Sequence, residues 1–189
     1  MKRLFSVVLM FSCATFLSAC SGPVVYKEFF GSGYSHNEII AFTGNKDMKL
    51  IVIGNPYQTD NKEFFDIIAS SMTGKNPGLP IRFTDTPVDA PNAPLRAIVQ
   101  FNPVKNAIGR TMCGEELPAP SENGLPDTAM FTLCKNTSEF STVWLKFPEG
   151  AKPGDEDFAF AIGTATRILF KRNPDPKGGE GSTCLLGSC

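Results

Sequence analysis

His36 is the only histidine in this chain of 189 residues, so any mechanism that uses a histidine base has to use it. It lies in Gly31-Ser32-Gly33-Tyr34-Ser35-His36, a stretch rich in glycine and serine. Catalytic groups need rigid support. No Gly-x-Ser-x-Gly motif surrounds any serine of the chain, so the nucleophile elbow of the Ser-His-Asp hydrolases is missing too. We therefore predict that His36 is a surface loop histidine and that it is not catalytic.

The acidic residues can also be explained without a catalytic or metal-binding role. Asp155, Glu156 and Asp157 lie near Glu149, but their spacing is not that of a calcium-binding EF-hand loop. Acidic residues at the start of a helix interact favourably with its dipole, and this explains the cluster. We predict no catalytic carboxylate pair and no metal site. The remaining acidic residues that we considered are scattered or solvated: Asp60, Asp66, Asp85, Asp89, Glu115 and Glu116.

Gly31-Ser32-Gly33 does not continue with the spacing of a dinucleotide- or phosphate-binding loop, so we expect no cofactor. Trp144 lies in an apolar strand-like segment and is expected in the core. Four aromatic residues, Tyr26, Phe29, Phe30 and Tyr34, could contact a partner or the membrane interface. The alternative that we favour is that they pack against the sheet of their own domain.

The N-terminus carries a segment of a recognisable type. Lys2 and Arg3 precede an apolar run from Leu4 to Leu17, which is too short to cross a bilayer and indicates a signal segment. The run ends in Leu17-Ser18-Ala19-Cys20, which resembles the lipobox of bacterial lipoproteins at every position. The alternative is an ordinary secretory signal peptide that is cleaved nearby, with Cys20 remaining a thiol.

The resemblance implies cleavage before Cys20 and a diacylglycerol joined to its sulfur by a thioether. Several acyl chains, palmitate among them, would then hold the protein stably on a membrane. In lipoproteins the residue after the cysteine directs sorting. Ser21 stands there in place of aspartate, which implies the outer membrane, with the domain facing the periplasm.

The other cysteines indicate disulfide bonds. Of six cysteines, Cys13 leaves with the signal segment and Cys20 carries the lipid, so four remain. An even number in an exported protein is typical of disulfides. Three connectivities are open, and we favour the two local pairs. Zinc is the alternative, but the spacing does not fit a zinc site and the only histidine is distant. The predicted pairs are Cys113–Cys134 and Cys184–Cys189.

Size and charge limit the function further. The mature chain from Cys20 to Cys189 has 170 residues, enough for one domain with a real core. Without Lys2 and Arg3 it has 16 basic and 19 acidic residues and a net charge of −3. The sequence shows no basic stripe, so we expect no nucleic-acid partner.

Hydrophobic periodicity predicts the secondary structure. Asp60 can cap a helix, and an apolar stripe that includes Phe158 and Leu169 predicts a second one. The chain would form an α+β domain, with a mostly antiparallel sheet of about five strands and two helices on one face. The predicted strands are 39–42, 48–53, 81–84, 95–102, 129–135 and 141–147, with a hairpin turn at 136–139, and the helices are 60–73 and 155–171.

We predict four parts of the chain: a signal peptide (1–19), a lipidated tether (20–36), one α+β domain (37–173) and a flexible tail (174–189). The tether is apolar enough that part of it should pack against the domain. The layout of residues 37–172 resembles that of small uncharacterised periplasmic α/β lipoprotein domains. This resemblance is general and transfers no functional residue.

The predicted function is a non-enzymatic role in the cell envelope, as a lipid-anchored binding or assembly module with an envelope protein as partner. One alternative is a small envelope hydrolase, which predicts that carboxylates or His36 converge in a cleft. Another is a small-molecule sensor, which predicts an apolar pocket between the sheet and a helix.

Overall fold

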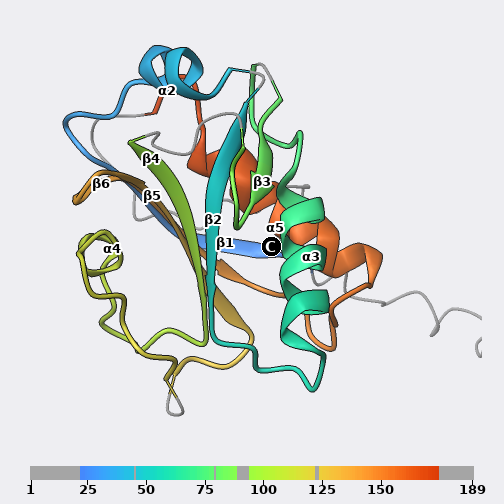
Figure 1. The fold of residues 1–189 in the computed structure, drawn as a ribbon. Helices are drawn as coiled ribbons and strands as arrows, with labels where there is room; N and C mark the ends of the chain where they lie inside the picture. Colours follow the sequence, from blue (N-terminus) through green and yellow to red (C-terminus); the bar gives the residue numbers. More distant parts are fainter. Residues whose placement is uncertain (1–21, 45, 79, 89–93, 122–123, 175–189) are drawn as a thin grey trace, which may run out of the picture.

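The computed structural model describes residues 22–44, 46–78, 80–88, 94–121 and 124–174. These residues form an α+β fold, as predicted, around one six-stranded sheet with the strand order β1-β6-β5-β4-β2-β3 (Figure 1). The strands are β1 (Val24–Phe30), β2 (Asp47–Ile53), β3 (Arg82–Thr84), β4 (Leu95–Phe101), β5 (Thr128–Lys135) and β6 (Ser138–Lys146). The helices are α2 (His36–Thr43), α3 (Asn61–Met72), α4 (Gly109–Met112) and α5 (Glu156–Leu169).

The sheet differs from the prediction in strand count and type. It has six strands, and β2 pairs in parallel with both β3 and β4, while the other neighbours pair antiparallel. Helix α3 connects β2 to β3 and allows them to pair in parallel. A crossover helix of this kind returns the chain to the end of the sheet at which the previous strand began. The extra strand is β1, which lies inside the segment predicted as a tether.

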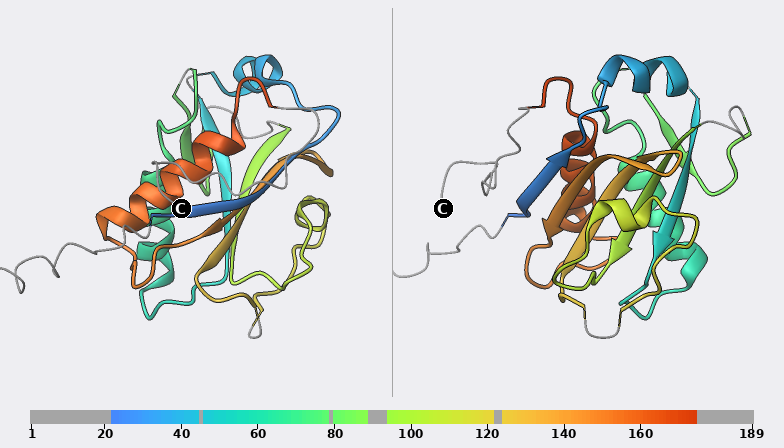
Figure 2. Two further views of the ribbon diagram at one scale, coloured as in Figure 1. Left: turned by 180° about the vertical axis from the view of Figure 1, so that it is seen from behind. Right: turned by 90° about the vertical axis from the view of Figure 1, so that its left-hand side faces the viewer.

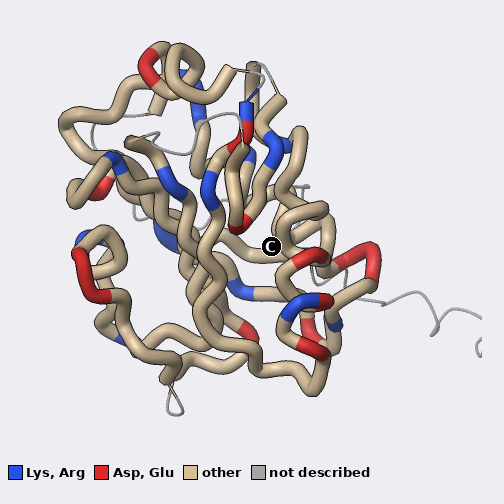
Figure 3. Tube along the Cα trace, in the orientation of Figure 1, with Lys and Arg blue, Asp and Glu red and all other residues tan. Residues whose placement is uncertain are grey.

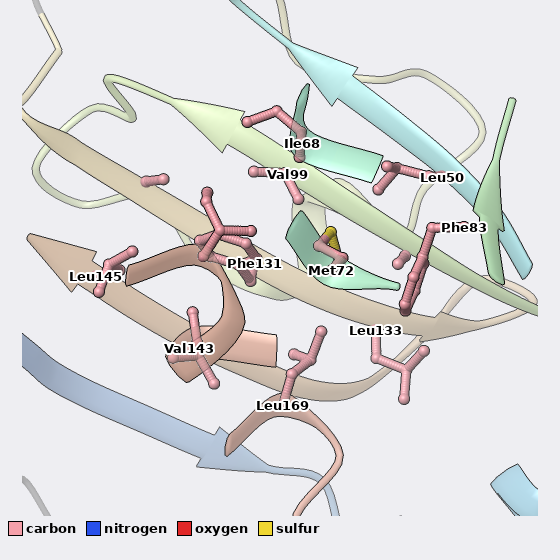
Figure 4. Close-up of a cluster of buried hydrophobic side chains, with 14 of the residues drawn as sticks. Leu50, Ile68, Met72, Phe83, Val99, Phe131, Leu133, Val143, Leu145 and Leu169 are labelled. Atoms are coloured by element: carbon pink, nitrogen blue, oxygen red, sulfur yellow. The ribbon is translucent and has the colours of Figure 1, made fainter. Parts of the chain in front are cut away.

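The elements form three layers (Figure 2). Helices α3 and α5 pack against each other and cover one face of the sheet. The main core fills the space between them and the sheet with aliphatic and aromatic side chains (Figure 4). Helix α4 and the chain around it cover the other face over a smaller core. That smaller core contains Trp144, which is buried as predicted.

Local sequence accounts for the two long helices. The side chain of Asp60 accepts hydrogen bonds from the backbone N–H groups of Lys62 and Glu63, which caps α3 as predicted. In α5 the predicted apolar stripe is fully buried. Both helices therefore begin and end within two residues of the predicted limits.

The prediction of a strand at residues 39–42 is wrong, because these residues belong to α2. An apolar run of four residues does not by itself distinguish a strand from a helix. The deciding signal lies before it, where the side chain of Ser35 accepts a hydrogen bond from the backbone N–H of Glu38. Ser35 and Glu38 have the spacing of a helix capping box.

The predicted tether is also corrected. Residues 24–30 form an edge strand that pairs with β6, and Val25 is 2 % exposed within the main core. The folded region therefore includes β1 and does not start at residue 37. The expectation that part of residues 20–36 packs is confirmed. The signal segment, Cys20, Cys184, Cys189 and the tail after residue 174 lie outside the described residues.

The two ends of the sheet are distinguished by the direction of β1. β1 begins at Val24, which pairs with Lys146 at the end of β6; we call this the N-proximal end. β1 ends at Phe30, which pairs with Ser141 close to the β5–β6 hairpin. We call this the distal end, and α2 lies there (Figure 1). Among the described residues, no helix is long and apolar enough to cross a bilayer.

Candidate functional site

The β1–α2 connection, residues 31–35, crosses the distal end between two hollows. Gly31 begins it by donating its backbone N–H to the carbonyl of Phe140, at 2.9 Å. A Cβ atom at Gly31 would lie 2.7 Å from the carbonyl oxygen of Glu139. Only glycine fits so close to a neighbouring backbone. The glycine-rich sequence thus builds a tight crossing over β6, where we had predicted a tether.

Tyr34 fixes this connection to the domain. Its hydroxyl donates a hydrogen bond of 2.7 Å to the carbonyl of Lys171, just beyond α5. Its ring lies 5.0 Å from that of Phe30 and 5.6 Å from that of Phe140, measured between centroids. Burial raises the pKa of Tyr34 well above the ordinary tyrosine value, so the hydroxyl is a stable donor.

The aromatic residues near the N-terminus therefore mostly pack within the domain, as we favoured. Phe30 and Tyr34 pack edge to face at the distal end, and Tyr26 packs against Trp144 with 5.9 Å between ring centroids. Phe29 differs, because it remains 44 % exposed at the rim of the first hollow. Of the four residues, it is the one best placed to contact a partner.

The first hollow is a groove of about 690 Å³ between the β1–α2 connection and the β5–β6 hairpin. Glu139, Lys135 and Arg110 supply its charged groups. Lys135 forms an ion pair with Glu38 of α2, which joins the hairpin to the helix. The hairpin turn is the tight pair Asn136-Thr137, shorter than the predicted turn, and Asn136 has a left-handed φ of 53°.

Glu139 is tied to the protein on one side of this groove. Its carboxylate accepts a hydrogen bond from the hydroxyl of Thr142 and also from the backbone N–H of Arg110 in α4. Burial raises the pKa of Glu139, and these hydrogen bonds and the charges of Lys27 and Arg110 only partly oppose it. The carboxylate thus supports α4 while one side faces the groove.

The raised pKa of Glu139 gives a pH dependence. A raised pKa means that the folded state binds the proton of Glu139 more tightly than the unfolded state does. Protonation of Glu139 therefore stabilises the fold below about pH 4.5, and this contribution is lost as the pH rises. We expect Glu139→Gln to raise the melting temperature at pH 7.5 and to lose that advantage near pH 4. The exposed Glu149→Gln variant is the control. An equal or lower melting temperature of Glu139→Gln at pH 7.5 would contradict this prediction.

The second hollow, of about 830 Å³, lies on the other side of the connection. It is lined by His36, Asn37 and Arg172, among others. His36 is the first residue of α2 and is half-buried, so the prediction of a surface loop histidine is wrong. Burial lowers the pKa of His36, with Arg172 acting in the same direction and the Phe170 backbone in the opposite one. Burial therefore favours the neutral form of the His36 imidazole.

The two titratable side chains do not form one site. His36 and Glu139 line different hollows on opposite sides of residues 31–35. Asp155, Glu156 and Asp157 lie at the start of α5, at the N-proximal end, as the helix-dipole interpretation predicts. Among the described residues, no group of three or more His, Cys, Asp or Glu side chains is arranged to hold a metal ion.

The predicted Cys113–Cys134 disulfide is confirmed. It joins the end of α4 to β5, and both cysteines are fully buried. Gly109, at the start of α4, has no space for a side chain, because a Cβ atom there would lie 1.9 Å from the Thr142 hydroxyl. The disulfide and this close contact hold α4 on the sheet beside the Glu139 groove.

Comparisons with known proteins give only a distant likeness of fold. No family model matches the chain, and no curated protein matches it. One similar solved structure is the PelC dodecamer from Paraburkholderia phytofirmans, with 13 % identity and a TM-score of 0.41 over 79 % of this chain and 99 % of that one. A single-residue variant of the same dodecamer has 14 % identity and a TM-score of 0.39, over 79 % and 98 % of the two chains.

The distal site was not apparent from the sequence. Arg110 lies in α4, Glu139 lies in β6 and Arg172 follows α5, and none belongs to a motif. One available signal was the Ser35/Glu38 capping pair, which would have placed His36 at a helix start. The other was the disulfide prediction, which placed residues 110–113 against β5 but did not show which side chains would accompany them.

Proposed function

We propose that the protein is a lipid-anchored envelope protein whose distal end is a binding surface with a non-enzymatic binding or assembly role. The observation that carries this proposal is the orientation of β1. Its first residue follows the proposed anchor closely, and its last residue leads directly into the two hollows. The strand thus separates an attachment end from a binding end.

Chain length sets the distance to the membrane. Only residues 21–23 separate Cys20 from β1, and four residue steps span at most about 14 Å in any conformation. The tether of residues 21–36 that the sequence suggested is therefore much shorter. The seven residues of β1 extend about 20 Å at the rise of a strand. The N-proximal end would lie at the bilayer and the distal end would face the periplasm.

The membrane assignment comes from the lipobox and from Ser21. Together they support acylation at Cys20 and transfer to the outer membrane, with an envelope protein as partner. The two alternatives find less support. A hydrolase needs its acid and base in one cavity, but His36 and Glu139 line separate hollows. A sensor pocket between sheet and helices would occupy space that the main core fills.

The anchor is tested by the intact mass of the protein purified from its native membrane. We expect a chain that begins at Cys20 and carries added acyl mass, and reduction should add the mass of two hydrogens for each disulfide. Replacing Cys20 with alanine should abolish the acyl mass and release the protein from the membrane fraction. A wild-type chain without acyl mass would contradict the anchor.

The binding end is tested separately by photo-crosslinking in cells. A photoreactive phenylalanine analogue at Phe29, which is 44 % exposed at the groove rim, should give a discrete adduct with an envelope protein. The matched control is Phe160 on α5, which is 48 % exposed on another face of the domain. Equal adducts from both positions, or none from Phe29, would remove the distal end from the proposal.

A further inference from the structure

Positions of basic and acidic residues are segregated along the strand direction of the backbone (Figure 3). Basic residues gather at the distal end, where β2 and β4 begin and α5 ends, whereas acidic residues gather where α3 and α5 begin. The distal basic residues are Lys46, Lys49, Lys75, Arg82, Arg96, Lys135, Arg167, Lys171 and Arg172. The N-proximal acidic residues are Asp60, Glu63, Asp66, Asp127, Glu149, Asp155, Glu156 and Asp157. Residues that are scattered in the sequence are thus brought together by the fold.

Three carboxylates at the distal end are paired with basic side chains, and a fourth, Glu139, accepts hydrogen bonds from Thr142 and Arg110. Glu28 pairs with Lys171 at 3.2 Å, and both oxygens of Asp47 accept hydrogen bonds of 2.7 Å from Arg82. Glu38 pairs with Lys135. Lys46, Lys49 and Lys75 are exposed and, within the described residues, have no carboxylate partner. The excess of positive charge is therefore available to a ligand.

Two of the basic residues are direct neighbours. Lys49 and Arg96 occupy paired positions on the parallel strands β2 and β4, and like charges in such positions are destabilising. Arg96 donates to the carbonyls of Cys113 and Gly114, at 2.9 and 3.3 Å, and neither bond neutralises its charge. Helix dipoles favour basic groups after α5, but they do not account for these two strand residues. An anionic ligand that binds beside Lys49 and Arg96 would account for this pair of positive charges.

Exposed apolar side chains accompany this charge. Phe29 is 44 %, Phe42 is 37 % and Val88 is 77 % exposed. Val88 lies at the distal end because its backbone N–H donates to Asp47, at 3.2 Å. Apolar and aromatic side chains mixed with basic ones are typical of surfaces that bind proteins. A purely anionic polysaccharide would use the charges but not the phenylalanines.

We infer that the distal end binds an acidic peptide segment of a partner protein, with glutamate or aspartate side chains contacting Lys46 and Lys49. Apolar side chains of the same segment contact Phe29 and Phe42. This inference rests on the proposed function, which supplies the compartment of the protein and makes the distal end the accessible one. It adds the chemistry of the partner.

The test compares two double variants that change the net charge equally. The full chain, in a neutral detergent, is titrated with a short synthetic peptide of alternating glutamate and phenylalanine. Lys46→Glu/Lys49→Glu, at the distal end, should weaken binding about tenfold or more at low salt. Lys146→Glu/Lys152→Glu, at the N-proximal end, should stay within about twofold of the wild type. Added salt should weaken wild-type binding.

Several results would overturn the inference: no binding, or an equal loss in both double variants. Equally tight binding of a glutamate–serine peptide or of polygalacturonate would show that charge alone is recognised. Salt-sensitive self-association of the wild type would make a second copy of the chain the occupant. Melting curves check folding, and Lys46→Gln/Lys49→Gln replaces the distal variant if it does not fold. The titration does not depend on the lipid, so its failure is distinct from failure of the anchor.

Discussion

Replacing Phe158 with alanine is expected to lower the free energy of unfolding by about 3–5 kcal/mol. Phe158 is fully buried, and its ring stacks on that of Phe147 with centroids 4.7 Å apart and planes 8° apart. It also contacts Tyr57 and Phe101, so one side chain joins α5 to the end of β4 and to the chain before α3. A whole small domain is stable by only about 5–15 kcal/mol. The expected loss is thus a large part of the total.

The control lies two residues away on the same helix. Phe160 is 48 % exposed, and Phe160→Ala should change the free energy of unfolding by no more than about 0.5 kcal/mol. Denaturant titrations of both variants measure the difference. Equal losses would mean that Phe158 does not hold α5 on the sheet. The N-proximal end, next to the proposed anchor, would then lack the packing described above.

The long elements were predictable because several local signals agree in each. In α3 the Asp60 cap, the apolar face and the terminal glycine all indicate the same helix. In α5 the buried stripe and the charges at both ends do so as well. The hairpin of β5 and β6 follows from two apolar runs around a polar turn. Such agreement between levels is what specifies a fold.

The parts that were not predictable depend on long-range pairing. Residues 24–30 form a strand because β6 offers an edge, and nothing local distinguishes them from an apolar tether. Helix α4 has only four residues, and the disulfide and the Gly109 contact hold it in place. The distal basic end requires that β2, β4 and α5 be placed side by side, so only the fold reveals it.

The disulfide is expected to be the second large contributor to stability. Cys113→Ala/Cys134→Ala should lower the free energy of unfolding by about 3 kcal/mol, since the bridge closes a loop between residues 21 positions apart. Alanine is preferred to serine, because a hydroxyl at either fully buried position would add its own desolvation cost. The measurement is denaturant unfolding under oxidising conditions.

The loss should begin locally. Without the bridge, α4 keeps the Arg96 hydrogen bonds to the carbonyls of Cys113 and Gly114 and the support of Glu139, so the sheet itself should stay folded. Hydrogen exchange should then rise first in residues 103–121 and leave β5 and β6 protected. Cys184→Ala/Cys189→Ala is the matched control and should leave exchange in residues 103–121 unchanged. If the Cys113/Cys134 variant unfolds at the wild-type denaturant concentration, the bridge is not what holds α4 on the sheet, and the Glu139 groove loses the wall on which its geometry depends.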